Sequence, residues 1–168
     1  MSAIQAMYTK WRRDDSLPVA ARLWKAKQYV LSSTGAPLWL HSTDSRGNGV
    51  RCIGRPLITN QGTMTVGDLV VLRSRPVPVE LATGPHGQLI IGSRTSINTG
   101  VSIHADQLVR IGKGVRIAPY VHIMDTAFHD LDNHNKRPTA QPVCIEDDVW
   151  ICVKSTVLPG VTDWKSVV

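Results

Sequence analysis

Aliphatic residues recur at every sixth position through much of the chain after residue 90. Three triplets carry this spacing: Ile91, Ile97 and Ile103; Ile111, Ile117 and Ile123; Ile145, Ile151 and Val157. Six residues form one short strand and a turn, so three such units close a triangle that stacks on the next coil by parallel pairing. A β-sandwich would instead alternate every two residues, with turns about every 8–12 positions. The spacing predicts a parallel β-helix and leaves its hand open.

The six-residue period is interrupted twice. The step from Ile103 to Ile111 is two residues too long, and the step from Ile123 to Ile145 is sixteen too long. Each coil of a solenoid contacts only its neighbours, so an insertion can leave as a loop without separating the stack. The longer excursion, residues 125–142, is rich in ionisable side chains: His129, Asp130, Asp132, His134, Lys136 and Arg137. Because loops on rigid scaffolds often carry function, we expect a functional site here.

Residues 1–35 are predicted to form a helical segment that precedes the β-helix domain of residues 50–168. Val19, Leu23, Ala26 and Val30 fall on one face of a helix. Ser16 is a candidate N-cap, Pro18 suits a first turn, and the STGAP sequence at 33–37 is expected to end the helix. We expect this helix to pack on the coil. Nearby lysines and arginines leave an amphipathic membrane-surface role open.

Composition narrows the class of protein. The 168 residues are 42% hydrophobic and 19% charged, which is typical of a folded domain. The net charge of +6 is scattered, without a basic run or a series of aromatic residues, so nucleic-acid binding is not expected. No apolar stretch approaches the roughly 20 residues of a membrane helix. Three widely spaced cysteines and no secretory signal indicate reduced thiols and a cytoplasmic location.

Several motifs together resemble one known family. The hexapeptides, the INTGVSIHAD stretch, the histidine-bearing loop and the IEDDVWI and VLPGVT sequences are similar to those of hexapeptide-repeat acyltransferases. Among these, the sugar and exopolysaccharide O-acetyltransferases of the maltose and galactoside type are most similar, over about residues 54–162. The resemblance implies a left-handed β-helix, a homotrimer, and acetyl-CoA bound in the groove between subunits. A loop from one subunit would help to build each active site.

His129 matches the catalytic base of this family. A sugar hydroxyl attacks a thioester poorly unless a base removes its proton, and neutral imidazole, with a pKa near ~6.5, serves at physiological pH. His134 and His122 are competing candidates. Together with His104 these histidines also raise the alternative of a zinc site like that of γ-type carbonic anhydrases. A zinc site needs three ligands in one cluster, and the spacing does not demand one, so no metal is expected.

Two further residues match acceptor-site positions of the galactoside-type enzymes. The resemblance implies that Asn98 hydrogen-bonds a hydroxyl or supports the tetrahedral intermediate, as a second catalytic residue. It implies that Asp106 binds the acceptor sugar or orients the histidine. A coil corner for Asn98 and a solvated turn for Asp106 remain alternatives. Asp125, at the start of the loop, is a third candidate for substrate binding, for bracing His129, or for capping a turn.

The resemblance also implies cofactor contacts near the last coil. Trp150 matches a tryptophan beside the CoA groove, with packing between subunits as the alternative. The backbone at Cys152 and Val153 matches amide groups along the CoA arm, which could face a developing oxyanion. Two departures stand out: Cys152 replaces the usual glycine, and Asp163-Trp164 replaces the start of another repeat, giving an apparently truncated C-terminus.

The sequence therefore predicts an acetyl-CoA-dependent O-acetyltransferase that acts on a hydroxyl of a sugar or polysaccharide precursor. Direct transfer is expected, since no cysteine is placed for a covalent intermediate. A non-catalytic trimeric scaffold or inactive relative is the main alternative, because of Cys152 and the C-terminal departure. A zinc-dependent hydratase is a further alternative.

Overall fold

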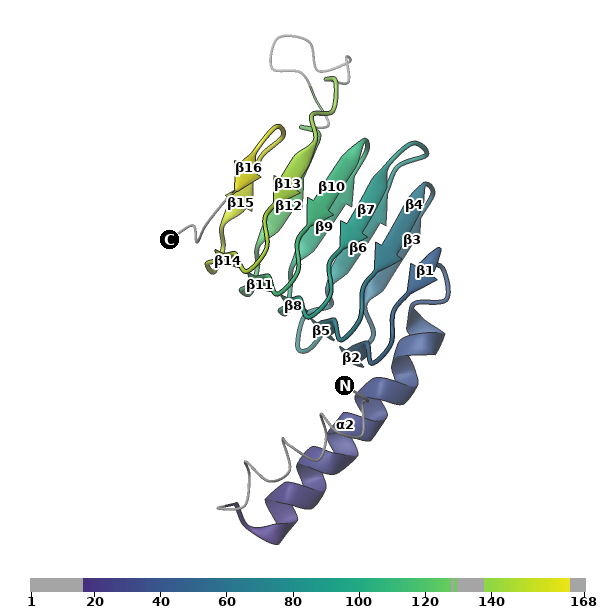
Figure 1. Ribbon diagram of the computed structural model, residues 1–168, viewed down its shortest axis with the longest axis vertical. Coiled ribbons are helices and arrows are strands. Elements are labelled where there is room, and N and C mark those ends of the chain that lie inside the picture. Colours follow the sequence, from purple (N-terminus) through teal and green to yellow (C-terminus); the bar gives the residue numbers. More distant parts are fainter. Residues whose placement is uncertain (1–16, 128, 130–137, 164–168) are drawn as a thin grey trace.

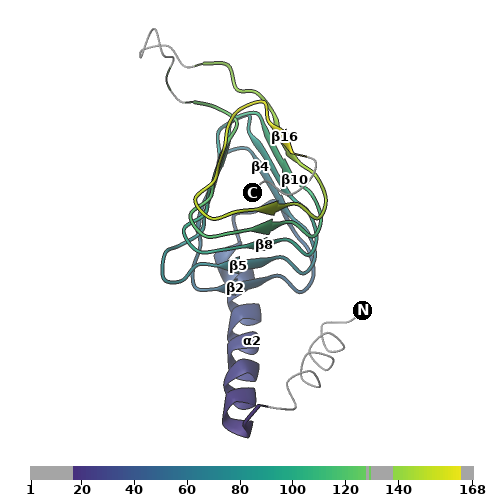
Figure 2. The same cartoon turned by 90° about the vertical axis from the view of Figure 1, so that its left-hand side faces the viewer.

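The computed structural model describes residues 17–127, 129 and 138–163. Within these residues the chain winds into a triangular coil, and each side of the triangle is an all-parallel sheet (Figures 1 and 2). We name the sides sheets A, B and C. Each circuit of the chain passes through A, B and C in turn before the next circuit stacks on it. The predicted parallel β-helix is confirmed, and the arrangement is consistent with the left-handed coil that the resemblance implies.

Short strands make up the three sheets in the described part of the chain. Sheet A contains β1 (Ser45–Arg46), β4 (Thr63–Val66), β7 (Gln88–Ile91), β10 (Leu108–Ile111), β13 (Val143–Ile145) and β16 (Thr162–Asp163). Sheet B contains β2 (Arg51–Ile53), β5 (Val71–Arg73), β8 (Ser96–Ile97), β11 (Arg116–Ile117) and β14 (Trp150–Ile151). Sheet C contains β3 (Leu57–Asn60), β6 (Glu80–Thr83), β9 (Ser102–Ala105), β12 (His122–Met124) and β15 (Thr156–Val157).

The aliphatic residues of the six-residue period fill the interior of the coil. All nine predicted positions are at most 7% exposed. They stack in register: Ile91 pairs with Ile111 and Ile111 with Ile145 in sheet A. Each fully buried side chain of this size stabilises the fold by about 1.5–3 kcal/mol relative to an exposed one. A column of such residues along each sheet therefore explains how strands of only two to four residues persist.

The triangle has three edges, which we name by the two sheets that each one joins. We call the edge between sheets A and B the AB corner (67–69, 92–94, 112–114 and 146–148), and that between B and C the BC corner (98–100, 118–120 and 152–154). The CA corner joins sheets C and A and includes 60–62, 83–87, 105–107 and the excursion after residue 125. In the sequence-coloured ribbon the excursion leaves the coil at this third edge (Figure 2).

Helix α2 (Val19–Trp39) precedes the coil and packs mainly against β2. Ala36 and Leu40 belong to the buried core, and the Arg51 guanidinium lies 4.8 Å from the centroid of the Tyr29 ring. Most of the helix projects away from the coil (Figure 1). The described residues contain no helix with the length and apolar character needed to cross a bilayer.

Two sequence-based expectations about this helix were wrong. It continues through the STGAP sequence to Trp39, although Pro37 lies inside it. Burial of Ala36 and Leu40 on the coil outweighs the local tendency to stop, and the Ser33 hydroxyl donates to the Tyr29 carbonyl oxygen at 2.9 Å. The expected apolar face does not pack on the coil either, since Val19, Leu23 and Val30 are each more than half exposed. Ser16, the expected cap, lies outside the described residues; Pro18 occupies the N-cap position.

Candidate functional site at two corners of the coil

Asp125 fixes the CA corner where the excursion begins. Its carboxylate is fully buried, and both oxygens accept hydrogen bonds from main-chain N–H groups of the preceding coil. Oδ1 accepts from Asp106 at 2.8 Å, and Oδ2 accepts from Gln107 at 2.7 Å and Leu108 at 2.8 Å. Three N–H donors offset the cost of burying the charge. In this arrangement the Asp125 carboxylate caps a turn, which was one of the three expectations for it.

The excursion returns to the same point. The Gln141 N–H donates to the Asp125 carbonyl oxygen at 2.8 Å, and the Gly160 N–H of the next coil donates to the Gln141 carbonyl oxygen at 3.1 Å. Both ends of the loop are therefore tied to one residue, which is itself tied to the coil below. A loop with a closed and rigid base can carry a side chain at a reproducible place above the coil.

His129, the predicted catalytic base, is one of the residues of the excursion that the structure describes. It is exposed, and its N–H donates to the Ala127 carbonyl oxygen at 2.6 Å. His134, the competing histidine, and the remaining charged residues of the loop lie outside the described residues, as do 164–168 beyond the C-terminal departure. His122, the other competitor, is exposed on the outer face of sheet C, away from the coil interior.

Asp106 forms a contact that the sequence analysis did not predict. Its Oδ1 lies 3.2 Å from Nε2 of His104, and the two side chains are only 13% and 25% exposed. Gly84 of the preceding coil makes room for this carboxylate, because a Cβ there would collide with Asp106 Oδ1. The signal was present in the sequence: residues two apart along a strand direction share one face. Asp106 therefore lies beside the imidazole of His104.

The predicted cofactor residues lie at the other edge of sheet C. Register places Asn98, Ala118 and Cys152 above one another at the BC corner, each directly after an inward isoleucine. Asn98 Oδ1 accepts a hydrogen bond from the Thr99 N–H at 3.0 Å, which fits the coil-corner alternative. Two coils separate Asn98 from Cys152, or about 10 Å. Val153 follows at the corner and is 58% exposed.

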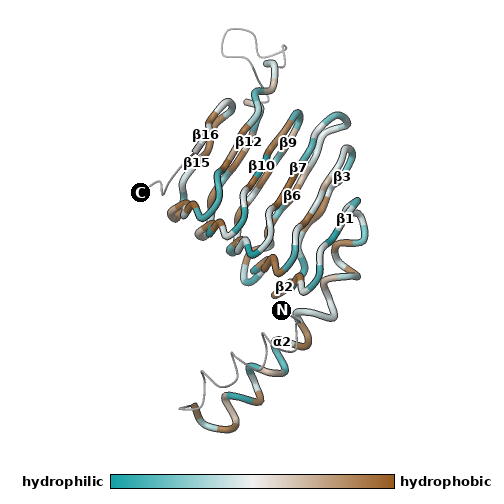
Figure 3. Tube along the Cα trace, in the orientation of Figure 1, coloured by the Kyte–Doolittle hydropathy of each residue, from teal (hydrophilic) through white to brown (hydrophobic). Residues whose placement is uncertain are grey.

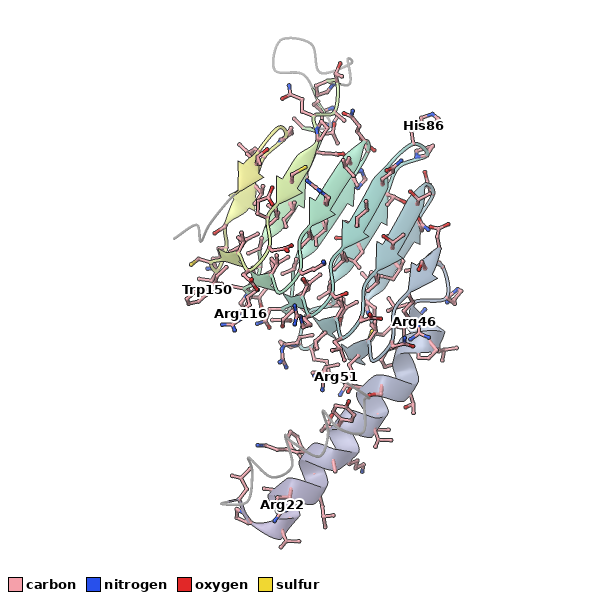
Figure 4. The ribbon with its side chains drawn as sticks, in the orientation of Figure 1. Arg22, Arg46, Arg51, His86, Arg116 and Trp150 are labelled. Carbon is pink, nitrogen blue, oxygen red and sulfur yellow. The ribbon has the colours of Figure 1, made fainter. Side chains whose placement is uncertain are left out.

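Trp150 projects outward from sheet B next to this corner. It is 56% exposed and pairs in register with Arg116, and both project from the same side of the coil as Arg51 (Figure 4). An exposed indole beside a guanidinium offers a flat apolar surface and a positive charge. The same surface would suit a neighbouring subunit, so both expectations for Trp150 stay open.

The candidate residues thus form two groups. Asp106, Asp125 and His129 lie at the CA corner, whereas Asn98, Cys152 and Val153 lie at the BC corner. The width of sheet C, from residue 101 to residue 106, separates the corners by about 16–17 Å at about 3.3 Å per residue. Within one protomer these groups do not meet. They can form one site only if the CA corner of one protomer approaches the BC corner of another.

The thiols and possible metal ligands add little to either group. Burial raises the pKa of the Cys52 thiol to about 12, so this cysteine is unreactive at neutral pH. Cys144 and Cys152 are partly buried and unpaired with any other cysteine. Among residues 17–127, 129 and 138–163, no group of three or more His, Cys, Asp or Glu side chains could hold a metal ion.

No protein-family model matches this chain, and no solved structure matches it.

Proposed function

We propose that this chain is an acetyl-CoA-dependent O-acetyltransferase that assembles as a homotrimer. Its acceptor would be a hydroxyl group of a sugar or polysaccharide precursor. The observation that carries the proposal is the loop of residues 125–142, the longer of the two interruptions of the six-residue period. Its ends are tied to the buried Asp125, and it bears His129 in exposed form.

The division of candidate residues between two corners supports the assembled form. A groove between protomers would bring the His129 loop of one protomer to the Asn98 and Cys152 corner of another. Several apolar side chains near the BC corner and the last coil are 37–58% exposed, which suits a covered surface: Tyr120, Trp150, Val153, Leu158 and Val161. A thioester arm lying along the stacked amides at Cys152 and Val153 would then end near the imidazole.

The proposed chemistry is a direct transfer. A nitrogen of neutral His129 accepts the proton of the acceptor hydroxyl as its oxygen attacks the thioester carbonyl carbon. The carbonyl oxygen becomes negative, and a main-chain N–H at the BC corner stabilises it. Collapse of this intermediate breaks the carbon–sulfur bond. The imidazolium returns the proton to the CoA thiolate, leaving an acetyl ester, free CoA and neutral His129.

Activity of a His129→Ala variant tests the proposal most directly. Thioester cleavage would be followed with acetyl-CoA across a panel of sugars and lipid-linked glycans. We expect the variant to lose about 10²–10⁴-fold in kcat, because that is the usual contribution of a general base. His86→Ala is the matched control, since His86 is also exposed at the CA corner but lies on an earlier coil (Figure 4). Equal activity of His129→Ala and the wild type would remove this mechanism.

Binding measurements separate this proposal from its alternatives. Calorimetry with acetyl-CoA should show binding at one site per protomer, and analytical ultracentrifugation should show a trimer. A trimer that binds no acetyl-CoA would favour the scaffold alternative, which the side chain at Cys152 makes worth testing. Stoichiometric zinc in the purified protein would instead favour a hydratase.

A further inference from the structure

Helix α2 carries an exposed stripe of large apolar side chains. The members of this apolar stripe are 52–72% exposed: Leu23, Trp24, Val30, Leu31 and Leu38. Trp24, Leu31 and Leu38 are spaced by seven, as are Leu23 and Val30, so they line one side of the helix. Apolar positions recur along the whole helix in Figure 3. A stripe of this kind indicates a binding surface, since scattered single residues would need no explanation.

The coil does not cover this stripe. The helix meets the coil through its opposite side, where Ser32 and Ala36 are buried and Tyr29 lies under Arg51. The stripe faces outward from a helix that already has a partner.

The stripe continues into a hollow at the base of the coil. This hollow of about 470 Å³ is lined by Leu38, Trp39, His41, Ser42, Arg55, Pro56 and Ile58. Leu38 belongs to both features, so they form one continuous surface. Arg55 and His41 supply basic groups at an otherwise largely apolar hollow, and no acidic side chain lines it.

The charged side chains of helix α2 are all basic, as are the ionisable side chains at the hollow. Residues 19–39 contain Arg22, Lys25 and Lys27 and no aspartate or glutamate. Lys27 lies within the apolar stripe, four residues from both Leu23 and Leu31, and is exposed. An apolar surface bordered by basic side chains fits a partner with an apolar interior and an anionic surface.

We infer that the apolar stripe and the adjoining hollow dock this protein on an anionic phospholipid surface. Helix α2 lies in the plane of the interface, with its leucines and Trp24 among the upper acyl chains. Lys27 extends along its own methylene groups to reach phosphates, as lysine does at such boundaries. Arg55 and His41 contact headgroups at the hollow. The inference does not depend on the proposed enzymatic function.

A second copy of the chain fits this surface less well. Packing two stripes face to face would bring the Lys27 ammonium groups together within an apolar seam. The helix offers no carboxylate to pair with them. A buried unpaired charge is costly, whereas a lipid surface supplies a phosphate for each one.

Vesicle sedimentation of the full chain tests the inference. Phosphatidylcholine vesicles would be compared with vesicles containing 30% phosphatidylglycerol, at low and high salt. The test variant carries Leu23→Gln and Leu31→Gln, which keep charge and helix propensity. We expect wild-type protein to bind the anionic vesicles in a salt-dependent manner. The double variant should bind at least about tenfold more weakly, because two apolar side chains no longer enter the interface.

Controls make every outcome decisive. Ile90→Gln removes an exposed apolar residue from sheet A and should leave vesicle binding unchanged. Circular dichroism of the double variant shows whether the helix and coil remain folded, and thioester cleavage with a water-soluble acceptor should be unaffected. No binding of wild-type protein to either vesicle overturns the inference. The inference is also overturned if the wild-type protein self-associates but binds no vesicles, and if the double variant no longer self-associates. That result would assign the stripe to contact with a second copy of the chain.

Discussion

The CA and AB corners turn the same chain through a similar angle, yet only one of them varies in length. From sheet A to sheet B the inward residues are always six apart, as in Ile91 to Ile97 and Ile111 to Ile117. From sheet C to sheet A the step is eight from Ile103 to Ile111 and twenty-two from Ile123 to Ile145. The excursion of residues 125–142 leaves from the variable corner.

Different bonds hold the two corners. At the AB corner left-handed backbone angles recur in each turn, together with exposed side-chain caps such as Asp147: Arg94 has φ 63°, and its N–H donates to the Asp68 carbonyl oxygen at 2.8 Å. Gly114 repeats this one coil later, with φ 70° and a bond to the Ser93 carbonyl oxygen at 2.9 Å. A turn defined by backbone angles admits one length, so any insertion would destroy it.

At the CA corner buried polar side chains fix the turn. Thr83 Oγ1 accepts from the N–H groups of Gln61 and Gly62 at 3.1 and 3.0 Å. Two coils further on, the Asp125 carboxylate accepts from N–H groups of its own preceding coil in the same way. Thr83 and Asp125 occupy the same inward position at the end of sheet C, two coils apart, with Ala105 between them. Because each side chain holds the strand ends of the preceding coil, the length of its own following turn is free. This arrangement explains why the excursion is tolerated at the CA corner.

Removing the Asp125 side chain should have the largest effect on stability. Asp125→Ala leaves three N–H groups without their acceptor, so we expect the free energy of unfolding to fall by about 2–4 kcal/mol. Asp147→Ala is the matched control at the AB corner, where one exposed carboxylate accepts from the Lys113 N–H at 2.7 Å. It should cost about 0.5–1 kcal/mol. Urea denaturation of both variants measures the difference, and equal losses would break the distinction between the corners.

A smaller loss is expected when the AB corner is changed at its backbone. Gly114→Ala places a side chain at φ 70° and directs its Cβ against Oδ1 of Asp148. We expect a loss of about 1–2 kcal/mol, since alanine disfavours left-handed angles. Arg94→Gly removes the strain at the equivalent position and serves as the opposite control; its stability should be unchanged or slightly higher. Tolerance of alanine at 114 would show that this corner is not limited by backbone angles.

The sequence predicted the coil because a six-residue period has a single geometric meaning. The inward positions of Ile97, Ile117 and Ile151 needed no knowledge of other parts of the chain. It also located the excursion. It did not predict the course of α2, because whether Ala36 is buried depends on a coil built by later residues. Leu23 and Val30 of the stripe on α2 belonged to the predicted apolar face, whereas Trp24, Leu31 and Leu38 were not singled out. Periodicity alone cannot say which surface such a face will meet.

The candidate site was predicted in parts. His129 and Asn98 were identified by resemblance, and their placement at different corners follows from counting around the triangle. The contact between His104 and Asp106 was missed, although the two residues are only two apart at the end of β9 and so share one face. The capping by Asp125 was one of three alternatives, and only the positions of the N–H groups of the preceding coil distinguish it. Side-chain contacts between successive coils are long-range in sequence, so a local pattern does not contain them.

The smallest expected effect concerns Asp44, which caps the first coil beside the CA corner but in contact with water. Its Oδ2 accepts from the Met64 N–H at 2.7 Å and from Nδ2 of Asn60 at 2.9 Å. These bonds, chiefly that from Met64, lower the pKa of the Asp44 carboxyl below its usual value of 3.8. The pKa is lower in the folded than in the unfolded chain, so the stabilisation is complete above about pH 4. It is lost as the pH falls through the folded value.

We therefore expect the stability difference between wild type and Asp44→Asn to be largest at neutral pH and to shrink under acid conditions. Urea denaturation at several pH values between neutral and acid gives that difference, and a carbon-detected NMR titration gives the Asp44 pKa itself. A pKa at or above the ordinary value, or a difference that does not depend on pH, would contradict the capping role. Such a result would mean that only buried side chains such as Asp125, and not exposed ones such as Asp44, stabilise this corner by capping.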